Sequence, residues 1–428
     1  MKLLNIKLLL RFFIIYFIIT IFQVFFLYFI PLYYLDILEA DPKELALTQV
    51  FPYLPLVISP LFGYIYDKYI TKESQSKILF NVSSSILAIS LFIFIFYKES
   101  LVLFGIITFL TIFSIYLIKT IMSNLYLHIV EKAPSNKRNL ILILRITTIL
   151  AYLTTSILFQ IIIDQINLLE LWNIFFLISF SLIIILLIFS MAINTKFRFL
   201  YHRSQLDTIH EDNSIYKKNP IMLFLYLAFF LGSSDLLFLY LFSSWILNKF
   251  GESSFKVYTF FLFLFPIGEI LGNLLAYKYD TQKNKIGKEY DKKKLMFIAI
   301  FSYMFLMSNL TFSNFFMILM LEFGLAFTAS IANFTYTSFI TDILKREKNR
   351  TCKFQFLQTY NSLARMIFVP LSYLFYTFVK VEFLIITSVT LFGFSVAIIF
   401  LTNCIERKTS RNEIQLSQSL LDQNKITE

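Results

Sequence analysis

The stretch SPLFGYIYDK, from Ser59 to Lys68, ends one long apolar segment of the chain, and GNLLAYKYDT, from Gly272 to Thr281, ends another. In each stretch two small residues stand four positions apart, so they share one helical face and let a neighbouring helix approach closely. The chain therefore repeats a close-packing helix end that carries a carboxylate. At an offset of 213 residues, Leu61, Tyr64, Tyr66 and Asp67 match Leu274, Tyr277, Tyr279 and Asp280, and Ser59 and Gly63 match Gly272 and Ala276.

The composition is that of a membrane protein. Of the 428 residues, 58% are hydrophobic and 15% are charged, whereas a soluble domain averages about 25% charged residues. Apolar runs of about 20 residues can cross a bilayer, and they must be helical because hydrocarbon offers no partner for a backbone amide. We therefore predict an all-α polytopic protein in a lipid bilayer. The apolar segments are 12–35, 45–66, 77–97, 101–128, 139–163, 168–192, 220–247, 256–277, 294–312, 315–340, 354–378 and 382–404.

The net charge of +11 is explained by topology. With the N-terminus in the cytoplasm, most Lys and Arg residues fall in the N-terminal segment, the even-to-odd connections and the tail, as the positive-inside rule requires. We expect both termini to be cytoplasmic and no nucleic-acid partner, whereas plasma membrane and internal membranes both stay open. Cys352 and Cys404 map to cytoplasmic segment ends, which argues against a disulfide or a zinc site. We expect no metal, no cofactor and a monomer.

A second pair of matching stretches lies at nearly the same offset. VEKAPSNKR follows the fourth segment and TDILKREKNR follows the tenth, so Glu131 corresponds to Asp342 and Arg138 to Arg350. Two matches at nearly one offset predict two six-helix halves in parallel orientation, an architecture known from carriers. The predicted divisions are an N-terminal bundle (1–193), a cytoplasmic linker (194–219), a C-terminal bundle (220–405) and a disordered cytoplasmic tail (406–428).

The stretch GYIYDKYITK resembles the loop between helices two and three of the major facilitator superfamily, written G-x-x-x-D-R/K-x-G-R/K-R/K. Gly63, Asp67, Lys68 and Lys72 occupy its first, fifth, sixth and tenth positions, whereas Ile70 replaces the second Gly. The EKAPSNKR stretch also resembles the loop between helices four and five of that family. The resemblance implies twelve transmembrane helices in two pseudo-symmetric bundles.

The same resemblance implies that Asp67 reaches the N-terminus of helix eleven and holds the cytoplasmic side shut. A helix N-terminus presents unpaired amides and the positive end of the helix dipole to such a carboxylate. The repeat predicts a second, weaker latch at Asp280, because Thr281 and Gln282 stand where basic residues are expected. The alternative is that such charges only mark the membrane boundary. The candidate gate residues are Gly63, Asp67, Lys68, Lys72, Glu131, Arg138, Ala276, Asp280, Asp342 and Arg350.

Ionisable residues inside apolar segments are the best functional signal. A charge at the bilayer centre costs about 2.5–3.5 kcal/mol, so each needs a partner or a wet cavity. They avoid segments three, six, nine and twelve, which the resemblance places against lipid, and we predict a polar cavity between the halves with a site near the midplane. The alternative is that they form buried ion pairs that fix helix packing. The six residues are Lys119, Arg145, Asp235, Glu269, Glu322 and Arg365.

These charges favour a secondary transporter that moves a small polar or anionic solute by alternating access. A carboxylate in a medium of low dielectric constant can take up a proton near neutral pH, so Asp235, Glu269 and Glu322 are candidates for proton coupling. Lys119 and Arg365 are candidates for binding an anionic group. A facilitative uniporter, and a transporter-like receptor, regulator or partner subunit that does not transport, stay open as alternatives.

One enzyme-like pattern occurs. HRSQLD gives His202 and Asp207 the His-x4-Asp spacing of some acyltransferases, but it stands in the short linker without an enclosing domain. We therefore expect no enzymatic activity.

Overall fold

The computed structural model describes residues 2–26, 39, 41, 50–70, 73–96, 100–132, 137–163, 173–174, 176–185, 220–239, 241–251, 264–285, 292–344, 350–376 and 378–402. Throughout these ranges the regular secondary structure is helical. The predicted linker (194–219) and tail (406–428) lie outside them.

Each of the twelve predicted segments contains helix. In the N-terminal half these are α1 (Lys2–Val24), α4 (Val50–Val57), α5 (Ser59–Tyr69), α6 (Glu73–Phe96), α7 (Leu101–Lys132), α8 (Lys137–Ile163) and an unlabelled helix at Phe176–Ile185. In the C-terminal half they are α11 (Pro220–Leu231), α12 (Leu236–Leu239), α13 (Phe242–Phe250), α15 (Leu264–Lys285), α16 (Lys292–Ser308), α17 (Phe315–Ile343), α18 (Arg350–Tyr376) and Val381–Thr402. Among the described residues, five helices are long and apolar enough to cross a membrane.

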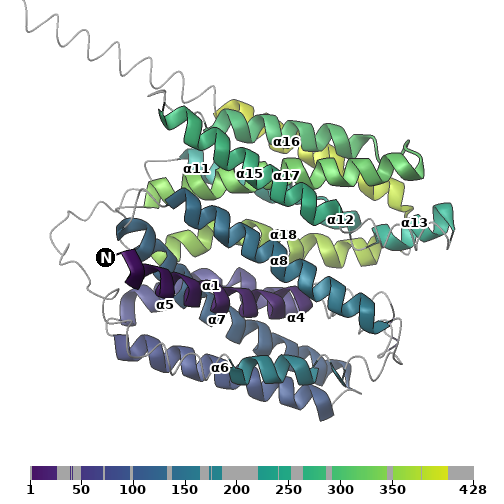
Figure 1. The fold of residues 1–428 in the computed structure, drawn as a ribbon. Helices are drawn as coiled ribbons and strands as arrows, with labels where there is room; N and C mark the ends of the chain where they lie inside the picture. The colour runs from purple at the N-terminus through teal and green to yellow at the C-terminus, as the bar shows by residue number, and fades with distance from the viewer. Residues whose placement is uncertain are drawn as a thin grey trace, which may run out of the picture.

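The helices run roughly side by side, with the purple-to-teal N-terminal half below the green-to-yellow C-terminal half (Figure 1). Two helices join the halves: α18 packs against α4, α5 and α7, and α8 packs against α15 and α17. These are the eleventh and fifth segments, so the two joints are related by the repeat in the sequence. At the left of Figure 1 lie α5 and the N-terminus of the chain, and we call this end the Asp67 end.

Two segments are broken rather than continuous. The second segment stops at Val57 and restarts at Ser59, because Pro60 has no amide to bond the carbonyl one turn earlier. The seventh segment is interrupted from Gly232 to Asp235, where the amide of Ser233 bonds the carbonyl of Phe230 at 3.1 Å in a tighter turn. The sequence predicts one uninterrupted apolar segment, 220–247, and the structure differs from that prediction here. Its polar side chains compete for backbone hydrogen bonds, which explains the break.

The repeated small residues make two different contacts. A Cβ added to Gly63 would lie 2.7 Å from Cα of Cys352, so this position brings α5 against α18 of the other half. A Cβ added to Gly272 would lie 2.3 Å from the carbonyl oxygen of Phe327, so that position brings α15 against α17 of the same half. Gly63 matches Ala276 in the repeat and Gly272 matches Ser59, so the two contacts are made by different positions of the repeated stretch.

Candidate functional site

Asp67 caps a helix of the opposite half. One carboxylate oxygen, Oδ2, accepts a hydrogen bond of 3.0 Å from the backbone amide of Cys352 in the first turn of α18. Amides in the first turn of a helix have no partner within that helix, so an acceptor there satisfies a free donor. Asp67 can reach this amide because Gly63, one turn earlier, has no side chain, so the backbones of α5 and α18 lie close together there.

Two more hydrogen bonds join α7 to the same part of α18. The amide nitrogen of Asn124 donates to Oγ1 of Thr351 at 2.9 Å, and that of Gln355 donates to Oγ of Ser123 at 3.0 Å. All four side chains are polar and uncharged. At the Asp67 end the halves are thus joined by hydrogen bonds from side chains to a helix backbone and between side chains.

The repeat-related joint, between α15 and α8, has its own hydrogen bond. The hydroxyl of Tyr277 donates to Oδ1 of Asn139 at 2.8 Å, near the beginning of α8. Ala276, the preceding small residue, is fully buried. The side chain of Asp280, predicted to form the second latch, is outside the described part of the structure.

The remaining gate candidates are spread around this end. Lys68 is exposed; its ammonium donates to the hydroxyl of Tyr64 at 3.2 Å and lies 5.2 Å from the ring centre of Tyr69. Those two tyrosines, Tyr64 first, raise the pKa of Lys68. Arg138 is partly buried at the start of α8. The side chains of Lys72, Glu131, Asp342 and Arg350 belong to the part that the structure does not describe.

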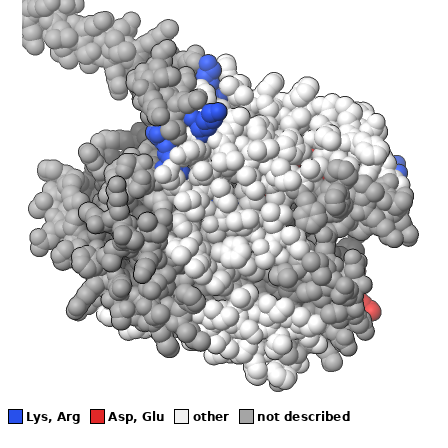
Figure 2. All heavy atoms as spheres, in the orientation of Figure 1, with Lys and Arg blue, Asp and Glu red and all other residues white. Residues whose placement is uncertain are grey.

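Described basic side chains gather at the Asp67 end. Figure 2 shows Lys and Arg clustered at the upper left, near the end of α15 that Figure 1 places there. The same view shows a smaller amount of Lys or Arg, together with Asp or Glu, at the right-hand edge.

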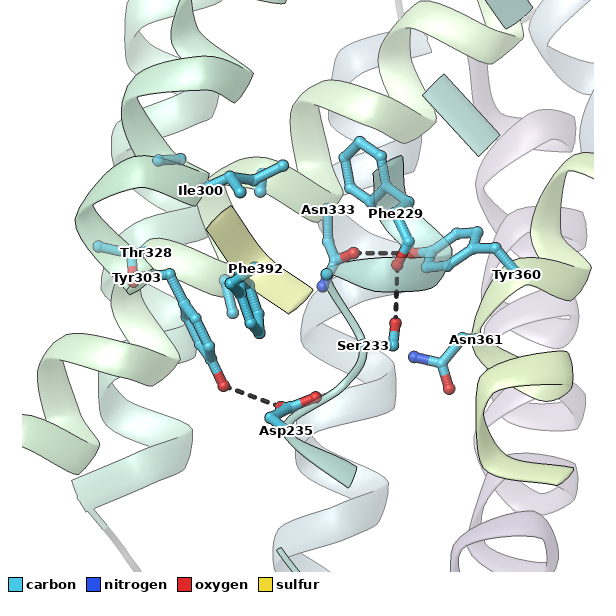
Figure 3. Close-up of a pocket in the computed structure, with 14 residues that line it drawn as sticks. Phe229, Ser233, Asp235, Ile300, Tyr303, Thr328, Asn333, Tyr360, Asn361 and Phe392 are labelled. Carbon is cyan, nitrogen blue, oxygen red and sulfur yellow. Dashed lines mark hydrogen bonds between the residues drawn. The ribbon is translucent and has the colours of Figure 1, made fainter. Parts of the chain in front are cut away.

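A polar cavity of about 100 Å³ lies within the C-terminal half, beside the break in the seventh segment (Figure 3). The hydroxyl of Tyr303 donates to Oδ2 of Asp235 at 2.8 Å across it. Arg365 interacts electrostatically with Asp235, and its Nε donates to Oδ1 of Asn361 at 2.7 Å. Glu322 interacts with Tyr303. The carboxylate of Asp235 thus lies within electrostatic range of the guanidinium of Arg365.

The position of this cavity differs from our expectation. We predicted a polar cavity between the halves, whereas this one is lined by residues of the C-terminal half alone. Tyr303 belongs to α16, the ninth segment, which the resemblance placed against lipid. Asp235 lies in the break between α11 and α12, so its side chain can turn inward. A cavity between the halves stays a prediction.

Serines fix the break to the last helix. Oγ of Ser234 donates to the carbonyl of Ser388 at 3.1 Å, and Oγ of Ser388 donates to the carbonyl of Ser234 at 2.7 Å. Two turns away along the last helix, Oγ of Ser395 donates to the carbonyl of Ala228 at 2.7 Å. The reciprocal pair ties the backbone of the break to the last helix. The run Gly-Ser-Ser-Asp within an apolar segment was the signal for this break.

Arg145 spans the interface between the halves. From α8 it donates to the backbone carbonyl of Asn333 at 3.1 Å and to Oγ1 of Thr337, both on α17. Glu269 on α15 interacts electrostatically with it. Arg145 therefore bonds α17 and interacts electrostatically with α15, the two helices of the other half against which α8 packs.

Lys119 stands apart from the other five charges. Its ammonium donates to Oε1 of Gln23 on α1, and lies 5.4 Å from the ring centre of Tyr16 and 6.0 Å from that of Tyr116. Nε2 of Gln23 in turn donates to the hydroxyl of Tyr116 at 2.8 Å. The cluster lies within the N-terminal half, between α1 and α7.

Solved structures resemble this arrangement closely in fold and distantly in sequence. The nucleoside transporter NupG matches with a TM-score of 0.61 and 14% identity, over 93% of this chain and 98% of its own. The proton:xylose symporter XylE, of the major facilitator superfamily, matches with a TM-score of 0.66 and 12% identity, over 94% and 96%. The human organic anion transporter MFSD10 matches with a TM-score of 0.65 and 11% identity, over 91% and 99%.

The chain has the major facilitator fold. No protein-family model and no curated protein matches its sequence. The solved structures match nearly the whole length of the chain, and with the five membrane-length helices they make it an integral, multi-pass membrane protein. In the major facilitator fold, α18 is helix eleven and α8 is helix five, so the Asp67 contact joins helix two to helix eleven.

Proposed function

We propose that this protein is a secondary transporter that carries a small polar solute by alternating access between its two halves. The observation that carries the proposal is how the halves are joined at the Asp67 end. There, Asp67, Ser123 and Asn124 reach α18 through hydrogen bonds that water could replace. Because such contacts contribute only about 0.5–1.5 kcal/mol each, they can open and close during a transport cycle.

The orientation follows from charge. Described Lys and Arg side chains gather at the Asp67 end, and positively charged ends of membrane proteins face the cytoplasm. On this proposal the structure is closed toward the cytoplasm, with Asp67 as part of the gate. On this proposal the two bundles, 1–193 and 220–405, move relative to each other, and 194–219 and 406–428 are the linker and the tail.

The charged residues in the segments supply the polar path. Arg145 and Glu269 face each other across the interface, Lys119 lies inside one half, and Asp235 lies inside the other. Structural neighbours named for nucleoside, xylose and organic anion transport support a small polar solute. Asp235, Glu269 and Glu322 are the proposed proton carriers.

The experiment compares small metabolites in cells that express the wild type, Asp235→Asn, Arg365→Gln or Thr390→Val at matched membrane levels. Thr390 is exposed on the last helix and bonds only its own helix, so Thr390→Val is the matched control. We expect a compound whose cellular level changes with the wild type and the control but not with the first two variants. If all four cell lines have the same metabolite levels, the transporter proposal is wrong and a role as a receptor or regulator is favoured.

A further inference from the structure

The charges inside the membrane segments are unequally divided between the halves. Within the described parts of the N-terminal apolar segments, the charged residues away from the segment ends are Lys119 and Arg145, both cationic. The C-terminal half holds three carboxylates and Arg365. Positive charge therefore predominates on one side of the interface and negative charge on the other.

Two of the three cations have an anionic partner in the protein. Glu269 interacts with Arg145 across the interface, and Asp235 interacts with Arg365 within the C-terminal half. Lys119 does not: among the described residues, no charged side chain acts on it. Its hydrogen bond goes to the neutral amide oxygen of Gln23.

The surroundings of Lys119 are nevertheless organised. Gln23 is itself held by the hydroxyl of Tyr116, so its amide oxygen is aimed at the ammonium. The rings of Tyr16 and Tyr116 face the same ammonium at 5.4 and 6.0 Å. Tyr16 also interacts with Arg145, so its ring lies near both cations of this half. Quadrupoles of aromatic rings and an amide stabilise a cation only partly, and an ammonium has three donors to satisfy.

We propose that Lys119 is the binding site for the negative group of a small organic anion, and that this anion is the transported solute. The inference rests on the proposed transport function and specifies its substrate class. The anion would accept hydrogen bonds from the ammonium in place of Gln23, and would supply a negative charge that none of the described side chains supplies there. Tyr16 and Tyr116 would border the body of the solute.

The test measures thermal unfolding of the purified full-length protein in detergent, with acetate, lactate, benzoate or inorganic phosphate at constant ionic strength. Acetamide, lactamide and benzamide are the uncharged controls. We expect at least one carboxylate, and not its amide, to raise the Tm of the wild type by about 2 °C or more. A rise with phosphate alone would instead indicate a phosphorylated solute at the same ammonium.

Four variants locate the effect. Lys119→Met should abolish the Tm rise, whereas Lys119→Arg should retain it. Gln23→Glu places an internal carboxylate on the ammonium, so it should abolish the rise without lowering the Tm of the ligand-free protein. Lys249→Met removes an ammonium that lies 4.5 Å from the ring centre of Trp245 in α13, and it should leave the rise unchanged.

Three results would overturn the assignment: equal rises with acids and amides, a rise that survives in both Lys119→Met and Gln23→Glu, or no rise with any anion. The outcome is separable from the proposed function. Anion binding without uptake into vesicles would remove the transport proposal and leave Lys119 as an anion-binding site. Uptake of a neutral solute that is unaffected by Lys119→Met would remove this inference alone.

Discussion

The carboxylate of Asp67 accepts a hydrogen bond from the backbone amide of Cys352, 285 positions later in the chain. The contact joins the two halves of the molecule at the first turn of α18. Burial, and then the carboxylate of Asp67, raise the pKa of the Cys352 thiol. The reactivity of the Cys352 thiol therefore depends on whether the contact between Asp67 and α18 is formed.

Asp67→Asn should speed the reaction of Cys352 with a maleimide, measured in a Cys404→Ser background. An interaction of about 0.3–1 kcal/mol with the helix terminus corresponds to a two- to fivefold larger open population. Loss of the negative charge should also lower the thiol pKa, so more thiolate is present below that pKa and the rate profile moves to lower pH. An unchanged rate at every pH would contradict the latch.

Gly63→Ala should destabilise the contact more than Asp67→Asn does. The new Cβ would lie 2.7 Å from Cα and 2.9 Å from N of Cys352, and backbone atoms cannot rotate away as side chains do. We expect a loss of about 1–3 kcal/mol in the free energy of unfolding, measured by denaturant titration in detergent. Gly393→Ala is the control, because its Cβ would meet only Sδ of Met304 at 4.0 Å. Equal effects of the two substitutions would argue against close packing at Gly63.

Arg145→Met and Glu269→Gln should be coupled. Each single change leaves the opposite charge without its partner, whereas the double change removes both. A double-mutant cycle on the free energy of unfolding should give an interaction of about 0.5–3 kcal/mol. Strictly additive losses would mean that Arg145 acts only through Asn333 and Thr337 on α17.

Ser234→Ala and Ser388→Ala should each destabilise the protein slightly, by about 0.6 kcal/mol, the average for such bonds in a membrane. Their two hydrogen bonds are reciprocal, so the losses should be less than additive. The exposed Thr390, whose hydroxyl bonds its own helix, provides a Thr390→Val control with no expected change. The free energy of unfolding in detergent checks all three.

The sequence by itself determined the membrane setting, the number of segments and the duplication. These follow from segment length, hydropathy and the repeated Gly63 and Asp67 pattern, all of which are local properties of the chain. The sequence also showed which segments carry charges, because a charge in hydrocarbon is costly wherever the helix packs.

Only the tertiary structure decided the partners of those residues. Tyr303 pairs with Asp235, Gln23 with Lys119, and Glu269 with Arg145, each across segments far apart in the chain. Periodicity along one helix gives the face on which a residue lies but not the helix that covers that face. For the same reason the spacing of small residues could not show that Gly63 packs against the opposite half while Gly272 packs within its own. That choice depends on the rotation of each helix among its neighbours, which is set by packing over the whole bundle.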